Sequence, residues 1–192
     1  NVNPLPVPVI TGDNEVCAGD AGLLYTTESG MSNYVWTIST GGTITSGGGT
    51  TDNSATVTWN TPGYQQISVR YTNASGCVAT ASTVYPVVVH PLPLVSCPGD
   101  FKVCHNAAPF TLTGAAPAGG SYSGPGVNAG VFNPATAGTG THIITYTYSG
   151  TCINTCTFNI TVDPAPVGSN ITTSVCSESE LSFDLQSAIT NG

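Results

Sequence analysis

Residues 65–71 read QQISVRY, and this alternation of polar and apolar side chains decides the fold class of the chain. Ile67, Val69 and Tyr71 fall on one side of an extended strand, and the polar residues, Ser68 among them, fall on the other. A period of two with β-branched and aromatic residues is typical of a strand that is buried on one face. The stretch therefore predicts a β-strand with Ser68 directed away from the core.

Three more runs share this period, and turn-forming clusters separate them. The runs are 55–59 (ATVTW), 142–148 (HIITYTY) and 156–162 (CTFNITV). Between the runs lie clusters such as STGGTITSGGG, NTPG and TAGTG. Many short strands joined by Gly- and Pro-rich turns predict an all-β chain of antiparallel β-sandwiches. Trp36, in NYVWTIST, is then expected in the core between two sheets.

A Val-x-Pro-x-Pro element occurs three times, as VNPLP at 2–6, VHPLP at 89–93 and VDPAP at 162–166. Proline cannot donate a ladder hydrogen bond and fixes φ, so each element ends a strand and forms a short, stiff connector. The spacing predicts tandem repeats. We expect them at residues 1–90 and 91–163, with 164–192 beginning a third, incomplete repeat.

Four of the seven cysteines lie at similar distances along the sequence from these elements. Cys17 and Cys104 each lie 15 residues after the Val that opens their repeat. Cys77 and Cys152 lie 12 and 10 residues before the Val that opens the next repeat. These four cysteines therefore occupy two equivalent pairs of positions.

The register predicts the disulfide pattern of the chain. The equivalent bridges of the two repeats are expected to be Cys17–Cys77 and Cys104–Cys152, which leaves Cys97 to pair with Cys156. Cys176 is predicted to have its partner beyond residue 192. Closing each repeat in this way should stabilise it by about 3–4 kcal/mol.

A zinc site is the alternative for Cys97, Cys104, His105, Cys152 and Cys156. Cys152 and Cys156 are four residues apart in a β-run, which places their Cα atoms about 13 Å apart. Zinc needs its thiolate ligands about 2.3 Å from a single ion. Many cysteines and few lysines also indicate an oxidising compartment outside the cytoplasm. We therefore expect disulfides and no metal.

Charge and hydropathy exclude two classes of partner. The chain has two Lys and Arg residues against ten Asp and Glu residues, for a net charge of −8. A nucleic-acid partner requires a basic face, which Arg70 and Lys102 alone do not form. No apolar run approaches the 18 residues or so that a membrane-spanning helix requires. We expect no nucleic-acid partner and no insertion into a membrane.

The candidate catalytic residues are scattered along the sequence. His90 lies in a connector, His105 beside a cysteine and His142 in a strand, and no Ser or Cys lies in a nucleophile elbow. The Gly-rich run GGSYSGPGVNAGVF lacks the Gly-Lys-Ser/Thr ending of a phosphate loop. Its glycines are expected in positive-φ turns, with Tyr122 and Phe132 closing the core. We expect no enzyme activity and no cofactor.

Acidic residues near the predicted junctions are the candidate calcium ligands. They are Asp13, Glu15 and Asp20 on one side, and Asp100 with Asp163 on the other. None follows the dense Asp-x-Asp pattern of calcium loops. The pattern favours solvated loop carboxylates.

Both repeats resemble known extracellular repeats. ITGDNEVCAG, YVWTIST, GGTITSG and ATVTWNTPG resemble the PKD-like repeats of large Bacteroidota surface proteins. FTLTGAAPAGGSYSGPGVNAGVFNP resembles the Ig-like repeats of the same proteins. Cys97-Pro98 together with CTFNITV resembles hyalin-type repeats, whose first and last strands are joined by a disulfide; this likeness also implies the pair Cys97–Cys156.

The resemblance implies tandem immunoglobulin-like (PKD-like) β-sandwiches in a type IX-secreted adhesin on the exterior of the outer membrane. The function it implies is that of a stiff stalk in adhesion and gliding motility. The partners would be neighbouring repeats of the same chain and, through distant regions, surface glycans or other surface proteins. The alternatives are an accessory module of a secreted multidomain hydrolase and a subunit of a polymerised surface filament.

Overall fold

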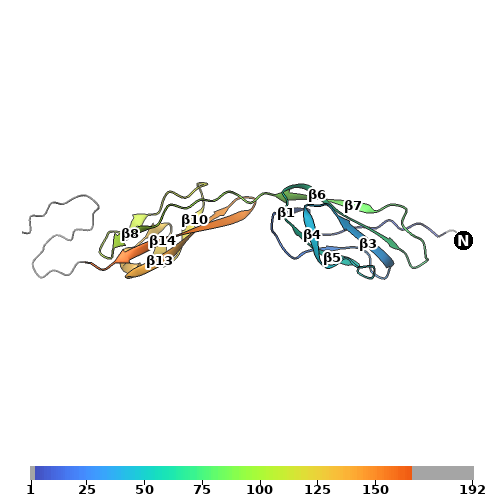
Figure 1. Cartoon of the computed structure of the whole chain (residues 1–192), viewed down its shortest axis with the longest axis horizontal. Coiled ribbons are helices and arrows are strands. Elements are labelled where there is room, and N and C mark those ends of the chain that lie inside the picture. The colour runs from blue at the N-terminus through green and yellow to red at the C-terminus, as the bar shows by residue number, and fades with distance from the viewer. Residues whose placement is uncertain (1–2, 166–192) are drawn as a thin grey trace, which may run out of the picture. The chain divides into compact units, whose positions relative to one another are not determined.

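The computed structural model describes residues 3–165, which form two compact units of β-strands (Figure 1). Unit 1 takes in the described residues up to Pro93 together with Gly150–Ile153. Unit 2 takes in Leu94–Ser149 and the described residues from Asn154 onward. The chain thus passes to unit 2 three residues after the boundary predicted at residue 90. Most of the predicted third repeat, residues 166–192 with Cys176, lies outside the described residues.

Unit 1 is a sandwich of two sheets. One sheet has the strand order β1-β7-β6-β3, formed by Glu15–Cys17, Thr83–His90, Gly63–Thr72 and Ser32–Ile38. The other has the order β2-β5-β4, formed by Leu23–Thr26, Ser54–Trp59 and Gly42–Gly47. β1 runs parallel to β7, whereas β6 is antiparallel to both of its neighbours. The first and last strands of the unit therefore end at the same end of the sheet.

The core of unit 1 follows the predicted alternation. Ile67 and Val69 of β6 are fully buried, and Trp36 of β3 is 7 % exposed. The Trp36 indole donates a hydrogen bond to the Asp52 carbonyl at 2.9 Å, so its polar atom is satisfied inside the sandwich. The prediction of a core tryptophan is confirmed.

Ser68 lies on the face of β6 away from the core cluster, and it is nevertheless buried. It is 7 % exposed rather than open to solvent. β6 is a central strand, so β3 and β7 flank Ser68 on both sides. Its hydroxyl lies 2.6 Å from the Thr37 hydroxyl, and this hydrogen bond offsets the cost of burial.

A chain of hydrogen bonds crosses the core of unit 1. The indole of the fully buried Trp59 donates to the Tyr25 hydroxyl at 2.9 Å, and Tyr25 donates in turn to the Asp13 carbonyl at 2.9 Å. The two rings meet edge to face with their centroids 6.4 Å apart. Burial raises the pKa of Tyr25, which keeps the hydroxyl protonated and able to donate. The loop before β1 is thereby attached to the second sheet.

Unit 2 also has two sheets. The larger has the order β10-β13-β14-β8, formed by Ser121–Ser123, Gly140–Ser149, Ile153–Asp163 and Phe101–Cys104. The smaller has the order β11-β12-β9, formed by Val127–Asn128, Val131–Phe132 and Phe110–Thr111, and is followed by the short helix α1, Pro134–Ala137. Phe132 is fully buried, and Tyr122 packs against the same core. These positions match the sequence prediction for the Gly-rich run.

The turn glycines of that run also behave as expected. Gly126 has a φ of +75°, which is costly for a residue with a side chain. A Cβ at this position would lie 2.6 Å from the Cβ of Ala137. Glycine is therefore required here by backbone conformation and by close packing against α1.

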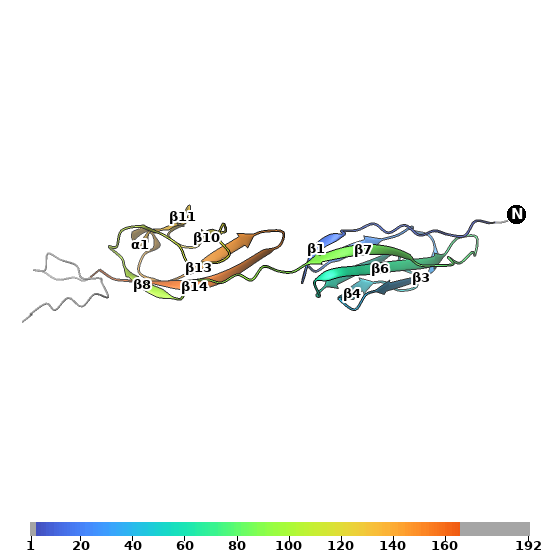
Figure 2. The same cartoon turned by 90° about the horizontal axis from the view of Figure 1, so that it is seen from above.

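The larger sheets of the two units share one topology (Figure 2). β8, β14, β13 and β10 occupy the places that β1, β7, β6 and β3 occupy in unit 1. β8 pairs in parallel with the last strand β14, as β1 pairs with β7. Within residues 3–165, no helix is long and apolar enough to cross a membrane.

Substitution of Tyr25 tests the hydrogen-bond chain. Tyr25→Phe keeps the ring but leaves the buried Trp59 N–H without an acceptor, so we expect a loss of about 1–3 kcal/mol in the free energy of unfolding. The matched control is Tyr64→Phe, because Tyr64 is 90 % exposed. Urea unfolding followed by tryptophan fluorescence measures both variants. Equal stabilities for the two variants would contradict the assigned role of Tyr25.

Candidate functional site

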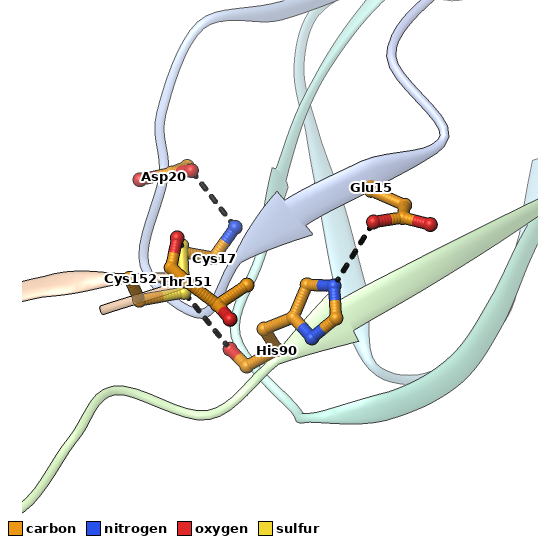
Figure 3. The surroundings of a disulfide bond; sticks show 6 residues. All are labelled: Glu15, Cys17, Asp20, His90, Thr151 and Cys152. Carbon is orange, nitrogen blue, oxygen red and sulfur yellow. Dashed lines mark hydrogen bonds and ion pairs between the residues drawn. A yellow bond between two sulfur atoms is a disulfide. The ribbon is translucent and has the colours of Figure 1, made fainter.

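A disulfide joins the end of β1 to the turn between β13 and β14 (Figure 3). It links Cys17 to Cys152 with a Cα–Cα distance of 5.8 Å, within the usual range for a disulfide. The two cysteines are 135 residues apart in the sequence. The turn Gly150–Ile153 is part of unit 1, although the strands on either side of it continue into unit 2. The bond therefore fastens this turn to the end of the first strand.

The backbone around Cys17 is held by the parallel pairing of the sheet. Cys17 is in register with His90, the last residue of β7. The next two residues continue the attachment, because Ala18 N–H donates to the His90 carbonyl at 2.9 Å and Gly19 N–H donates to the Trp59 carbonyl at 2.7 Å. Cys17 is thus attached to both sheets of unit 1 through its neighbours.

The side chains of Asp20, Glu15 and His90 make further contacts at the end of β1 (Figure 3). The Asp20 carboxylate accepts a hydrogen bond from the Cys17 N–H at 2.9 Å, and Asp20 N–H donates to the Cys17 carbonyl at 3.1 Å. His90 Nε2 lies 3.4 Å from Glu15 Oε2. This pair is exposed on the Glu15 side, so we expect it to contribute about 0–1 kcal/mol when His90 is protonated. The tight turn at Asp20 is the stronger constraint on Cys17.

The disulfide sulfurs are packed against backbone. Cys152 is only 3 % exposed, and its Sγ lies 3.9 Å from the His90 carbonyl oxygen. The Sγ of Cys17 lies 3.8 Å from the Thr151 carbonyl oxygen. Neither sulfur of a disulfide carries a proton, so these are packing contacts. Burial of Cys152 limits the access of an external thiolate, which thiol–disulfide exchange requires.

The predicted pairs Cys17–Cys77 and Cys104–Cys152 are wrong. Cys77 is a free cysteine, and Cys104 is disulfide-bonded to a residue other than Cys152. The reason is the direction of the last strand in each unit. Cys17 lies at the end of β7, whereas Cys77 lies in the loop before β7 begins, and an eight-residue strand spans about 23 Å. Disulfide Cα atoms lie within about 7 Å of each other.

The same geometry separates Cys104 from Cys152. Cys104 is in register with Asp163, the last residue of β14, and Cys152 immediately precedes the first residue of that strand. Eleven residue steps of extended chain place these positions about 36 Å apart. Each predicted bridge would have had to span the whole length of a last strand.

Unit 2 contains the third predicted pair, Cys97–Cys156. The Cα atoms are 5.8 Å apart, and the bond closes 59 residues. Cys97 packs against the core of unit 2. All four cysteines of the alternative zinc site are in disulfides and offer no thiolate to a metal.

The remaining candidate residues are not brought together. His90 lies near Glu15, His142 Nε2 is 2.8 Å from the Gly138 carbonyl, and the His105 backbone bonds to Asp163. Within residues 3–165, no group of three or more His, Cys, Asp or Glu residues is placed to hold a metal ion.

Two of the candidate calcium ligands accept hydrogen bonds from backbone N–H groups. Asp100 accepts hydrogen bonds from the Asn159 side chain at 2.9 Å and from the Asn159 backbone at 2.8 Å. These bonds favour the ionised form and lower the pKa of Asp100. Asp20 accepts from the Cys17 N–H, as described above. Both carboxylates therefore have structural roles.

Residues 3–87 match the family model described as the PKD-like domain. The match lies within unit 1 and covers less than half of the chain. This match ends before unit 2, whose family stays a prediction from its sequence. PKD-like domains are typically non-catalytic modules. No curated protein sequence matches the chain.

Several solved structures are similar to this chain. The fibronectin(III)-like modules of CbhA from Clostridium thermocellum are 17 % identical, with a TM-score of 0.36 over 81 % of this chain and 95 % of that chain. Domains 4 and 5 of the S-layer protein SbsC are 14 % identical, with a TM-score of 0.33 over 83 % and 100 %. Protocadherin gammaB7 EC3-6 is 14 % identical, with a TM-score of 0.30 over 81 % of this chain. The chain spans half the length of that protocadherin.

Removal of Cys17 tests the energetic role of the disulfide. Cys17→Ser frees a loop of 135 residues, so we expect the free energy of unfolding of unit 1 to fall by about 2–5 kcal/mol. Both tryptophans of the chain, Trp36 and Trp59, lie in unit 1, so their fluorescence during urea unfolding reports this unit alone.

The matched control is Cys77→Ser, which removes a cysteine that takes part in no disulfide. This variant should unfold at the same urea concentration as the original chain. A loss of stability in Cys77→Ser and not in Cys17→Ser would contradict the observed pairing.

Proposed function

We propose that the chain is a structural repeat segment of a large type IX-secreted adhesin, similar to the SprB-like gliding-motility adhesins of Bacteroidota. It acts as a stiff extracellular stalk on the exterior of the outer membrane. The PKD-like domain and the disulfides support an extracellular structural module. Its partners are neighbouring repeats of the same chain, and adhesive contacts are made through distant regions. The observation that carries the proposal is the Cys17–Cys152 bond.

This bond changes the path that tension takes through the chain. Tension that enters before unit 1 reaches Cys17 at the end of β1, crosses the disulfide to Cys152, and continues along β14. Residues 18–151 lie outside this shortest covalent path. Most of the hydrophobic core of unit 1 and half of the buried core residues of unit 2 are therefore protected from extension while the bond is intact.

The bond keeps a long segment of the chain out of the stretched path. The bypassed segment has 135 residue steps, which correspond to roughly 470 Å of extended chain at about 3.5 Å per residue. A stalk built in this way keeps its length under load even when its sandwiches open locally. Such length control is expected of a module that transmits force and is of no use to a module that only binds a soluble ligand.

The surface composition suits an exposed stalk. Charged residues make up 6 % of the chain, and Thr, Ser, Asn and Gly supply much of its polarity. Interactions between exposed charges weaken with ionic strength, whereas neutral hydroxyl and amide groups are insensitive to it. The stalk is therefore expected to keep its solubility and stiffness over a wide range of salt concentrations.

Single-molecule stretching of the full chain by its termini tests this proposal. Cys17→Ser removes the Cys17–Cys152 bond, so the 135 bypassed residue steps can enter the stretched chain. The Cys97–Cys156 bond still keeps 59 steps out of it. The contour length of the fully stretched variant should therefore exceed that of the original chain by roughly 270 Å.

Cys77→Ser is again the matched control and should leave the contour length unchanged. A reducing buffer should release the full length in all three proteins. Equal contour lengths for Cys17→Ser and the oxidised original chain would overturn the proposed mechanical role.

A further inference from the structure

Cys77 lies between the last two strands of the larger sheet of unit 1, as Cys152 lies between the last two strands of the larger sheet of unit 2. Cys152 lies in the turn between β13 and β14, and Cys77 lies in the loop between β6 and β7. β6 and β7 hold the same places in their sheet as β13 and β14 hold in theirs. Cys152 is in a disulfide, whereas Cys77 is free.

Cys17 and Cys104 are equivalent to each other by strand register. Cys17 ends β1 and is in register with His90, the residue after Val89. Cys104 ends β8 and is in register with Asp163, the residue after Val162. Val89 and Val162 each open a Val-x-Pro-x-Pro element. Both of these first-strand cysteines are disulfide-bonded.

The surroundings of the two turn cysteines also correspond. Cys152 Sγ packs against the carbonyl of His90, which belongs to the proline element that leads into unit 2. The Cys77 N–H donates to Asn73 Oδ1 at 2.9 Å, and Asn73 Nδ2 donates to the Pro4 carbonyl at 3.2 Å. Pro4 belongs to the proline element that leads into unit 1. Each turn cysteine is therefore held beside the connector that precedes its own sandwich.

We propose that Cys77 forms a disulfide with the cysteine that ends the first strand of a sandwich placed immediately before Val2. The bond would be the equivalent of Cys17–Cys152, one repeat earlier along a stalk. The proposal rests on the proposed function, because it requires sandwiches in series.

The chemistry is thiol–disulfide exchange with a disulfide-bearing oxidoreductase of the extracytoplasmic compartment. The Cys77 thiolate attacks the oxidant's disulfide and forms a mixed disulfide. The thiolate of the preceding sandwich then displaces the oxidoreductase, which leaves as a dithiol with the two electrons. The same class of oxidant accounts for Cys17–Cys152.

A head-to-tail fusion supplies the missing sandwich. Residues 1–163, which contain both complete cores, are followed directly by residues 4–192 of a second copy. The junction reads Val-Asp-Pro-Leu-Pro and so keeps the proline element. Cys77→Ser in the first copy leaves a single Cys77, in the second copy. Cys104 of the first copy then takes the role of Cys17.

The fusion is folded under oxidising conditions, digested without reduction and analysed by mass spectrometry. We expect the peptide with Cys77 to be linked to a peptide with Cys104, and alkylation of Cys77 to fall from complete in the single chain to none. Cys104→Ser in the first copy alone should restore full alkylation. The Cys17–Cys152 peptide serves as the internal measure of correct folding.

Full alkylation of Cys77 in a fusion that contains Cys17–Cys152 would overturn the inference. A link that survives Cys104→Ser in the first copy, or a fusion without Cys17–Cys152, would overturn it as well. The stretching experiment on the single chain does not depend on Cys77. The stalk proposal therefore stands or fails separately.

Discussion

The parallel pairing of the first strand with the last strand is the constraint on which the rest of unit 1 depends. It places Cys17 at the end of β7, where the chain leaves the sandwich. A cysteine at this place cannot reach the loop at the other end of its own sandwich. It can reach a turn supplied by a later part of the chain, and Cys152 supplies one. The disulfide is therefore a direct consequence of strand direction.

Strand position was predictable from the sequence because alternation is a local property. The runs at 55–59, 65–71, 142–148 and 156–162 all lie within strands of the structure, and Trp36 lies in the core. The burial of Ser68 is not predictable in this way, because local alternation separates two faces but does not say whether both are covered. A central strand between two neighbours buries even a serine when a hydroxyl such as that of Thr37 is available.

Disulfide pairing was less predictable because it depends on which ends of the strands meet. The register of Cys17 and Cys104 against the proline elements was a real signal of equivalent positions, and the structure has that equivalence. Equivalent positions in two repeats do not imply pairing within one repeat. The length of the last strand decides which cysteines can pair, because a cysteine before an eight-residue strand is too far from one beside the end of that strand to form a disulfide.

Direct identification of the disulfide partners of Cys17 tests the central claim most directly. The folded full chain is alkylated, digested without reduction and analysed by mass spectrometry. The structure predicts a peptide pair that joins Cys17 to Cys152, with Cys77 recovered in its alkylated form. A peptide pair that joins Cys17 to Cys77 would contradict both the strand geometry and the proposed path of tension.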